Sequence, residues 1–430
     1  MFKAIVTAWK LPDLRKKMLF TIMILVLFRI GCVIPVPFID ASVISGWFNS
    51  AANSGTMFGY FNVLSGQAFS QGTLFALSVS PYITASIVMQ LLTIAIPALE
   101  RLQKSGEEGQ KKINAITRYL TVGLALITSY GYYLTLKTSV NAITDPSTFA
   151  MIVILACHCA GAAIIMWMGE KINERGIGNG ISLILFVNII SSLPTMASSF
   201  VAYFQQTPVI VPIYAGMILV AIAIIAFVVF MTESERRLPV QYAKRVVGRK
   251  MYGGQSTYLP IKLNMSGVMP IIFASTIVSL PSTIALFFPQ AQEGTFWYGL
   301  LQALSSGSFV YAVVLCLLII AFSYFYLSIS FNPVEVANNL KKNGGFIPGI
   351  RPGKPTSDFI TKSLHKITLI GAFFLGIIAI IPMLVNLTGI SFGSVTFGGT
   401  SLLILVGVVL EVRTDLESQI TMRHYKGFLE

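Results

Sequence analysis

The chain has 430 residues, of which 55% are hydrophobic and only 11% are charged. Its mean hydropathy is +0.76. A soluble domain carries about 25% charged residues, so this chain has too little charge to cover a water-facing surface, and the same figures exclude a disordered or fibrous protein. The apolar runs are too long and continuous for an outer-membrane barrel. The composition therefore predicts an all-α polytopic membrane protein.

Apolar stretches long enough to cross a ~30 Å hydrocarbon layer recur along the whole chain. We expect ten membrane-spanning helices, over residues 18–36, 72–96, 115–136, 149–169, 181–204, 209–232, 267–289, 308–331, 364–385 and 397–415. The basic start followed by an apolar run resembles a secretory signal, but that run extends to about Pro35 without a small-residue cleavage pattern. We therefore expect it to be retained as the first span.

Lys and Arg lie almost entirely on one side of these spans. The chain carries 30 Lys and Arg against 17 Asp and Glu, a net charge of +13. The basic segments are the amino terminus, the loops 97–114, 170–180, 233–266 and 332–363, and the tail. With residues at the span edges assigned to their nearer loop, these segments hold 28 of the 30, while Lys137 lies on the other side and Arg29 well inside a span. The positive-inside rule places these segments, and with them both termini, in the cytoplasm.

Two of the predicted spans contain nearly the same six-residue motif. Pro-Tyr-Ile-Thr-Ala-Ser runs from Pro81, and Pro-Ile-Ile-Phe-Ala-Ser runs from Pro270, an offset of 189 residues. Chance similarity between two Pro-broken helices is one explanation. The other explanation is a unit of five spans that occurs twice. Because five is odd, the two copies insert in opposite orientations, and a pathway between such repeats lies near the membrane midplane. We expect two inverted halves, residues 1–205 and 206–430.

The spans contain little that could do covalent chemistry or couple ions. We find no Asp or Glu inside the first nine spans and no His-Glu-x-x-His or Gly-x-Ser-x-Gly motif. The run Cys157-His158-Cys159 resembles a metal clip. Neighbours two apart on a helix point about 200° apart, however, so buried thiols beside a hydrogen-bonded histidine are expected instead of a metal site. Arg29 either snorkels to the outer interface or has a functional role.

The external segment 37–71 contains an apolar, uncharged stretch from Phe58 to Phe69. It is too short to span a membrane and too apolar to be left in water. We expect a re-entrant helix packed inside the protein or a helix lying flat in the interface, and a re-entrant segment here could close a pore.

The two longest basic loops, 233–266 and 332–363, are longer than loops that serve only to set the orientation of the spans in the membrane need to be. Topology and attraction to anionic lipid are one explanation. A large acidic or nucleic-acid partner that docks on the cytoplasmic face is the sharper one.

Several longer sequence motifs of this chain resemble those of one protein family. From Glu174 to Ser182 the chain reads Glu-Arg-Gly-Ile-Gly-Asn-Gly-Ile-Ser, which is similar to the signature before the fifth helix of the bacterial SecY family, the channel subunits of the Sec protein translocase. The word from Pro81 resembles that family's second-helix signature, and Gly349–Gly353 its loop between helices eight and nine. Phe28–Gly31 and Gly398–Leu402 also fit, so the resemblance covers essentially the whole chain.

This resemblance implies two halves hinged around an hourglass pore with an aliphatic ring at its waist. When the family's ring positions are matched to this chain through the shared motifs, the implied ring residues are Val79, Ile83, Ile181, Leu185, Ile272 and Ile404. Val79 with Ile83, and Ile181 with Leu185, are four apart and share a helical face. Such a ring resists ion flow by dewetting, because apolar side chains do not replace an ion's hydration. Alternatively, all six are ordinary core residues.

A plug, a lateral gate and a docking face are implied as well. The plug, about 58–70, is a re-entrant helix after the first span that carries Phe58, Tyr60, Phe61, Leu64 and Phe69. The gate lies between helices 2/3 and 7/8, with Thr84 and Leu280 at its seam. The docking residues are Arg351, Lys244, Arg245, Arg249 and Lys250.

The function implied is a passive pore of the bacterial cytoplasmic (inner) membrane, not an enzyme and without cofactors. It passes unfolded preproteins across the membrane and releases signal sequences and other hydrophobic segments sideways into lipid. Its implied partners are SecE, SecG, the SecA ATPase, the ribosome through its RNA and proteins, and anionic lipids. A secondary transporter, which shares the inverted repeat, and a membrane scaffold without a pore remain the alternatives.

Overall fold

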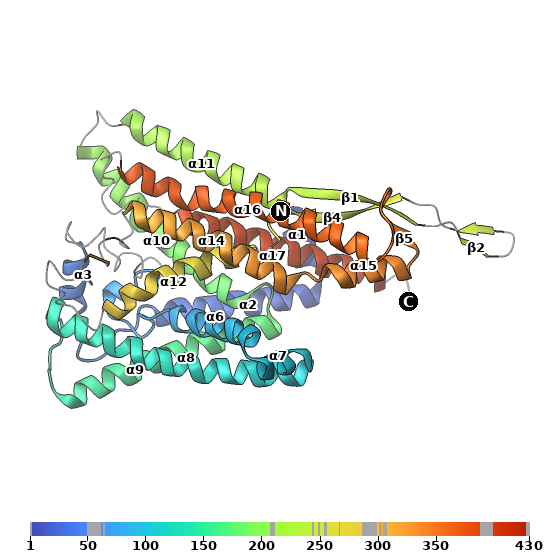
Figure 1. The fold of residues 1–430 in the computed structure, drawn as a ribbon. Helices are drawn as coiled ribbons and strands as arrows, with labels where there is room; N and C mark the ends of the chain where they lie inside the picture. Colours follow the sequence, from blue (N-terminus) through green and yellow to red (C-terminus); the bar gives the residue numbers. More distant parts are fainter. Residues whose placement is uncertain are drawn as a thin grey trace.

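A computed structural model shows a long bundle of helices with a small sheet at one end (Figure 1). It describes residues 2–49, 62, 65–206, 211–242, 245–247, 250–252, 256–265, 267–285, 299–300, 303, 308–387 and 399–426. The sheet, α7, α15 and the end of α17 lie at one end of the bundle, and α3 lies at the other (Figure 1).

The first part of the chain is helical apart from its connections. Its elements are α1 (Phe2–Lys10), α2 (Pro12–Gly31), α3 (Ala41–Asn49), the 3-10 turn η1 (Phe69–Gln71), α6 (Ser80–Ala95), α7 (Pro97–Lys104), α8 (Glu107–Thr135), the π-helical turn η2 (Leu136–Val140), α9 (Thr148–Arg175) and α10 (Gly180–Gln206). Within this part, α8 packs against both α6 and α9.

The second part combines helices with short strands. Its helices are α11 (Val211–Glu233), α12 (Met269–Ala285), α14 (Phe309–Ser330), α15 (Pro333–Lys342), α16 (Lys354–Leu387) and α17 (Gly399–Lys426). Its strands are β1 (Glu235–Tyr242), β2 (Arg245–Val247), β3 (Lys250–Tyr252), β4 (Ser256–Lys262) and β5 (Gly345–Phe346). Here α14 packs against α12 and α16.

Every predicted span overlaps a helix, in the order α2, α6, α8, α9, α10, α11, α12, α14, α16 and α17. Among the described residues, three helical stretches are long and apolar enough to cross a membrane: Thr148–Arg175, Phe309–Lys342 and Lys354–Ile381. The bent pair α6 and α7 makes a fourth if it counts as one span. The structure therefore has several helices that are long and apolar enough to span a membrane, and the count of ten stays a prediction.

The predicted span 72–96 is wrong about where its helix begins. Residues before Ser80 form turns, with Gly72 and Ser78 both at positive φ (60° and 51°), so the helical hydrogen-bond ladder cannot extend through them. Val79 is the cap of α6 and not part of it, although its carbonyl accepts the first helical bond from the Ile83 amide at 3.0 Å. At its other end α6 meets Pro97, and the chain bends by 101° into α7.

An all-α fold is also wrong for the basic loops. β1 pairs antiparallel with β4 and, at its end, with β5, so the loops 233–266 and 332–363 meet in one three-stranded sheet of order β4-β1-β5. Leu238 and Val240 are buried while Arg237, Pro239 and Gln241 are exposed. This alternation with a period of two was the available strand signal, and the high charge of the loop masked it.

The signature loop after α9 ties the amino-terminal part to α17. The Gly178 amide, at a φ of 73°, donates to the Asp415 carboxylate at 2.9 Å, and the Ile177 amide donates to the Thr21 hydroxyl at 3.1 Å. Ile177 packs with Leu14 and Leu416 in a buried cluster. The glycines of this loop therefore serve a close contact between two parts of the chain.

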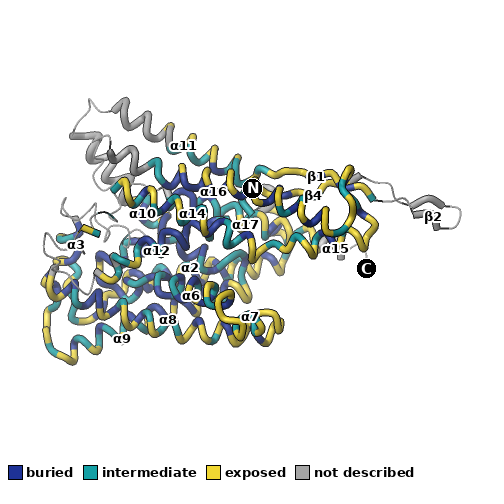
Figure 2. The backbone as a smooth tube through the Cα atoms, viewed as in Figure 1, coloured by how far each residue is buried: buried dark blue, intermediate teal, exposed yellow. Residues whose placement is uncertain are grey.

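Burial is concentrated where the helices meet, and α7 and the sheet end are largely exposed (Figure 2). One point of close approach is Gly161 of α9, where an added methyl group would overlap the carbonyl oxygen of Leu74. The turns before α6 thus pack directly against the α9 backbone. This packing also positions Val79, which ends the turns, and Ile83 in the first turn of α6.

Replacing Gly161 by Ala should destabilise the protein by about 1–3 kcal/mol, because the methyl group must displace backbone in a packed core. Gly123→Ala on α8 is the matched control, since no atom lies within 4 Å of the added methyl group there. That control should be neutral or stabilising by up to about 1 kcal/mol. Thermal unfolding of the purified variants in detergent measures both, and equal midpoints would contradict the close packing.

Candidate functional site

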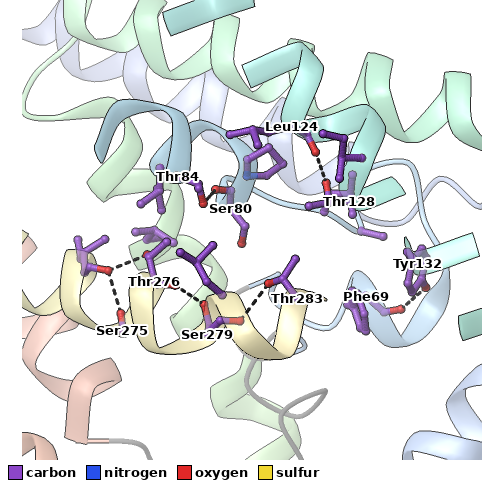
Figure 3. Close-up of a pocket in the computed structure, with 18 of the residues that line it drawn as sticks. Phe69, Ser80, Thr84, Leu124, Thr128, Tyr132, Ser275, Thr276, Ser279 and Thr283 are labelled. Carbon is purple, nitrogen blue, oxygen red and sulfur yellow. Dashed lines mark hydrogen bonds between the residues drawn. The ribbon is translucent and has the colours of Figure 1, made fainter. Parts of the chain in front are cut away.

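A cavity of about 220 Å³ lies between α6 and α8 on one side and α12 on the other. In Figure 3, Ser80 and Thr84 of α6 face Thr276 and Ser279 of α12 across it. Leu185 of α10 and Ile404 of α17 also line it, so helices from both predicted halves converge here. None of its lining residues in the described part of the chain is charged.

Threonine and serine hydroxyls that face each other across the seam between α6 and α12 bond to their own helices. Thr84 donates to the Ser80 carbonyl at 3.0 Å, and Thr276 and Ser279 donate to the carbonyls of Ile272 and Thr276 at 2.7 Å. In the described part of the seam, these bonds run along the helices and not between them (Figure 3). The surfaces of α6 and α12 can therefore separate without leaving these polar groups unpaired.

Four of the six predicted ring residues meet at this cavity. Ile83, Leu185, Ile272 and Ile404 line it, each from a different helix and each buried. Val79 is buried in the same hydrophobic cluster but does not line the cavity.

Ile181 packs at the edge of this cluster, with its side chain beside Gly169 of α9. The structure thus brings together the four ring residues that come from α6, α10, α12 and α17, and it places Ile181 one helical turn away from them along α10.

A second, wider cavity of about 830 Å³ is lined by other residues of α12 and α17, nearer the basic end of the molecule. On α12 the first cavity is lined by Ile272 and residues after it, and the second is lined by residues 267–269, which lead into the helix. Along α17 the first is lined by Ile404, and the second mainly by residues from Gly407 to Ser418. Ile272 and Ile404 therefore stand where two cavities approach each other, as a constriction would.

Both predicted gate residues line the first cavity, Thr84 from α6 and Leu280 from α12. α12 contacts α6 and α8, which correspond to the predicted helices 7, 2 and 3. The predicted helix 8, α14, packs against α12. The seam between the two predicted halves thus runs along α12.

Of the predicted plug residues, Phe58, Tyr60, Phe61 and Leu64 lie outside the described residues. Phe69 is described: it is buried in η1, lines the first cavity, and its carbonyl accepts a hydrogen bond from the Tyr132 hydroxyl at 2.7 Å. The end of the predicted plug segment therefore sits at the cavity, close to the seam (Figure 3).

Tyr132 and Asn188 are site residues that the sequence analysis missed. Tyr132 is buried, packs against Phe69 and lines the first cavity. Asn188, three residues after Leu185, is also buried and donates to the Ser78 hydroxyl at 3.0 Å. A polar residue in the apolar run of α10 was the available signal for Asn188.

The predicted docking residues lie at the basic end of the molecule. Arg351 is exposed in the turn before α16, between Gly349 and Gly353, which both have positive φ (81° and 106°). Arg245 and Lys250 belong to the paired strands β2 and β3, and the β2 hairpin projects beyond the sheet (Figure 1). Lys244 and Arg249 lie outside the described residues.

Cys157, His158 and Cys159 point in different directions from α9. His158 is fully buried against the Tyr132 ring, Cys157 packs with another cluster, and the Cys159 thiol approaches the Val122 carbonyl at 3.9 Å. Within the part of the chain that the structure describes, no group of three or more His, Cys, Asp or Glu could hold a metal ion.

Comparison with solved structures places this arrangement in a known fold. A structure described as a protein conducting channel aligns with a TM-score of 0.64 and 18% identity, covering 96% of each chain. Sec61 in the canine ribosome–channel complex from the endoplasmic reticulum aligns with a TM-score of 0.62 and 17% identity, again over 96% of each chain. At these identities the likeness shows the fold.

Sequence comparison identifies the family. The SecY family model matches residues 73–413. Proteins named protein translocase subunit SecY from Streptomyces galbus and Mycobacterium bovis are each 42% identical to this chain, over 452 and 446 aligned positions, with all of both chains covered. The chain belongs to the SecY family.

Proposed function

We propose that this chain is a protein-conducting channel and not an enzyme. The observation that carries the proposal is the meeting of Ile83, Leu185, Ile272 and Ile404 at one cavity between the two predicted halves, whose described lining residues are uncharged. The name of the curated relatives, protein translocase subunit, supports the same function.

The proposed barrier is physical. Ions that enter an aliphatic constriction lose hydration and gain no replacement for it, so a narrow ring resists their flow. An unfolded polypeptide can push the same side chains aside, because they form no directional bonds with one another. We include Val79 and Ile181 in the ring as residues that pack behind it.

The proposed lateral gate is the seam between α6 with α8 and α12 with α14, with Thr84 and Leu280 on its two sides. The hydroxyl bonds that run along each helix support it, because opening the seam breaks mainly apolar contacts. A segment exposed there would be sorted by transfer into lipid, at about −0.5 kcal/mol for each strongly apolar residue and about +3 kcal/mol for each charge at the helix centre.

The proposed setting is the bacterial inner membrane, with ten spans in two inverted halves (1–205 and 206–430), both termini in the cytoplasm and residues 58–70 as the plug. SecE would clamp the halves and SecG would be a third subunit. The sheet that joins the two basic loops, together with Arg351, would form the docking face for SecA or the ribosome, and the same charges would attract anionic lipid. One solved relative by fold is a Sec61 channel in a ribosome complex.

Ile83→Ser and Ile404→Ser should each raise the resting ion conductance of reconstituted vesicles several-fold, because a hydroxyl at the constriction favours water there. Ile152→Ser, at an exposed position of α9 away from the cavity, is the matched control and should leave the conductance unchanged. Flux of a dye-quenching ion measures the effect. Vesicles that stay tight with both ring variants would contradict the constriction.

Arg351→Glu should block motor-driven export while insertion of membrane spans is less affected, because a motor contact is lost and the pore is not. Lys362→Glu makes the same charge change at an exposed position of α16 and controls for net charge. Parallel assays of ATP-driven export and span insertion distinguish the two activities. Equal loss of both would argue against a specific motor contact at Arg351.

Thr84→Cys combined with Leu280→Cys, in a chain whose four native cysteines are replaced, should allow a short thiol cross-linker to close the seam. Closure should strongly reduce both export and lateral release, and cleavage of the linker should restore them. Each single cysteine treated with the same reagent is the control. Undiminished export through the cross-linked chain would contradict a gate at this seam.

A further inference from the structure

Arg29 is the one Lys or Arg that lies well inside a predicted span. It stands in the last turn of α2 and is partly buried, and its guanidinium donates a hydrogen bond to the Gly66 carbonyl at 3.1 Å. The side chain thus contacts backbone within the protein, in the turn at the end of the predicted plug segment 58–70. A charged donor strengthens such a bond, and it does so more in surroundings of low dielectric.

Gly66 is enclosed from two sides. Its φ is 62°, and a methyl group added to it would lie 2.7 Å from the Ser191 hydroxyl, 2.8 Å from the Asn188 side-chain oxygen and 3.0 Å from the Arg29 guanidinium. Ser191 and Asn188 follow Leu185 on α10 by six and three residues. The Gly66 turn therefore sits between α2 and α10, next to the helix that supplies Leu185 to the constriction.

The turn from Ser65 to Thr73 is also bonded within itself. Asn62 accepts from the Gln67 amide at 2.9 Å through its carbonyl and from the Ser70 amide at 3.0 Å through its side chain. The Ser65 hydroxyl accepts from the Phe69 amide at 3.0 Å. Because most of these residues are buried, the turn behaves as one packed unit, and Arg29 and Tyr132 attach it at Gly66 and Phe69.

The Arg29 contact suits a reversible attachment. The described groups that Arg29 contacts are the Gly66 carbonyl and the Cys32 thiol, neither of which is a carboxylate, so releasing Gly66 leaves no acidic partner without its counter-ion. Displacing the turn while the site is dry would leave a partly buried charge without this bond, which is costly. If water fills the outer side of the constriction, water can replace the carbonyl and the cost falls. The contact therefore favours the resting arrangement and weakens as the pore hydrates.

We propose that Arg29 is a positioning residue that holds the turn 65–73 against α10, on the outer side of the aliphatic constriction, in the resting channel. This inference rests on the proposed channel function and names one contact that keeps the channel closed. Residues 65–70 are the described end of the predicted plug segment, so the contact acts on that segment where it reaches the cavity.

Hydrogen–deuterium exchange of the full chain in lipid nanodiscs tests the contact directly. Arg29→Met should speed exchange of the amides from Gln67 to Thr73 roughly tenfold or more, as expected for the loss of a hydrogen bond to a charged group. Arg29→Lys, which keeps the charge, should restore part of the protection. Arg118→Met, which removes a charge from the Arg118–Glu170 ion pair on α8 and α9, should leave these amides unchanged.

Gly66→Ala is the second variant, and it perturbs the turn while keeping the Arg29 charge, although its methyl group also approaches the guanidinium. It should speed exchange of the same amides, because its methyl group crowds Ser191 and Asn188. Exchange of the strands β1 and β4 should match the parent in every variant, which shows that the fold is intact.

Unchanged protection of the turn in Arg29→Met would overturn the proposal. Raised ion conductance in that variant with unchanged exchange would also overturn it, since Arg29 would then act on the ions and not on the turn. If the parent chain fails to translocate polypeptides, the channel function falls, and the exchange result still decides the contact.

Discussion

The structure depends on one constraint: the two predicted halves meet through aliphatic side chains that offer ions nothing in place of water. Ile83, Leu185, Ile272 and Ile404 come from four helices, and they line a cavity whose described lining residues include no charged side chain. Such apolar contacts exclude water, and because they are non-directional they can rearrange. A barrier of polar bonds would hold one shape, whereas this one can yield to a polymer.

Directional bonds are found instead around the constriction, where they fix backbone. Tyr132 fixes Phe69, the Gly178 amide fixes α17 through Asp415, and strand pairing joins the two basic loops into one sheet. At the seam, by contrast, the hydroxyls of Thr84, Thr276 and Ser279 bond to their own helices. Rigid surroundings and an apolar seam are the arrangement that a gate between two bodies requires.

Much of this followed from composition and pattern. Apolar length and the distribution of Lys and Arg predict where the long helices lie, and the repeated word places Ile83 and Ile272 at equivalent positions, each two residues after a helix-starting Pro. The start of α6 was missed, because positive φ at Ser78 is a tertiary demand that no propensity for Ser indicates. The partner of Arg29 was beyond prediction for the same reason, since Gly66 is brought to it only by the packing of a buried turn.

Site-specific cross-linking of an arrested export client gives the most direct test of the central claim. Cysteines at positions 83, 272 and 404, each in a chain without native cysteines, would be assayed against a cysteine in the stalled segment, with the exposed position 152 of α9 as the comparison. The account predicts cross-links from all three constriction positions and none from position 152. A client that crosses the membrane and reaches none of the three would contradict it.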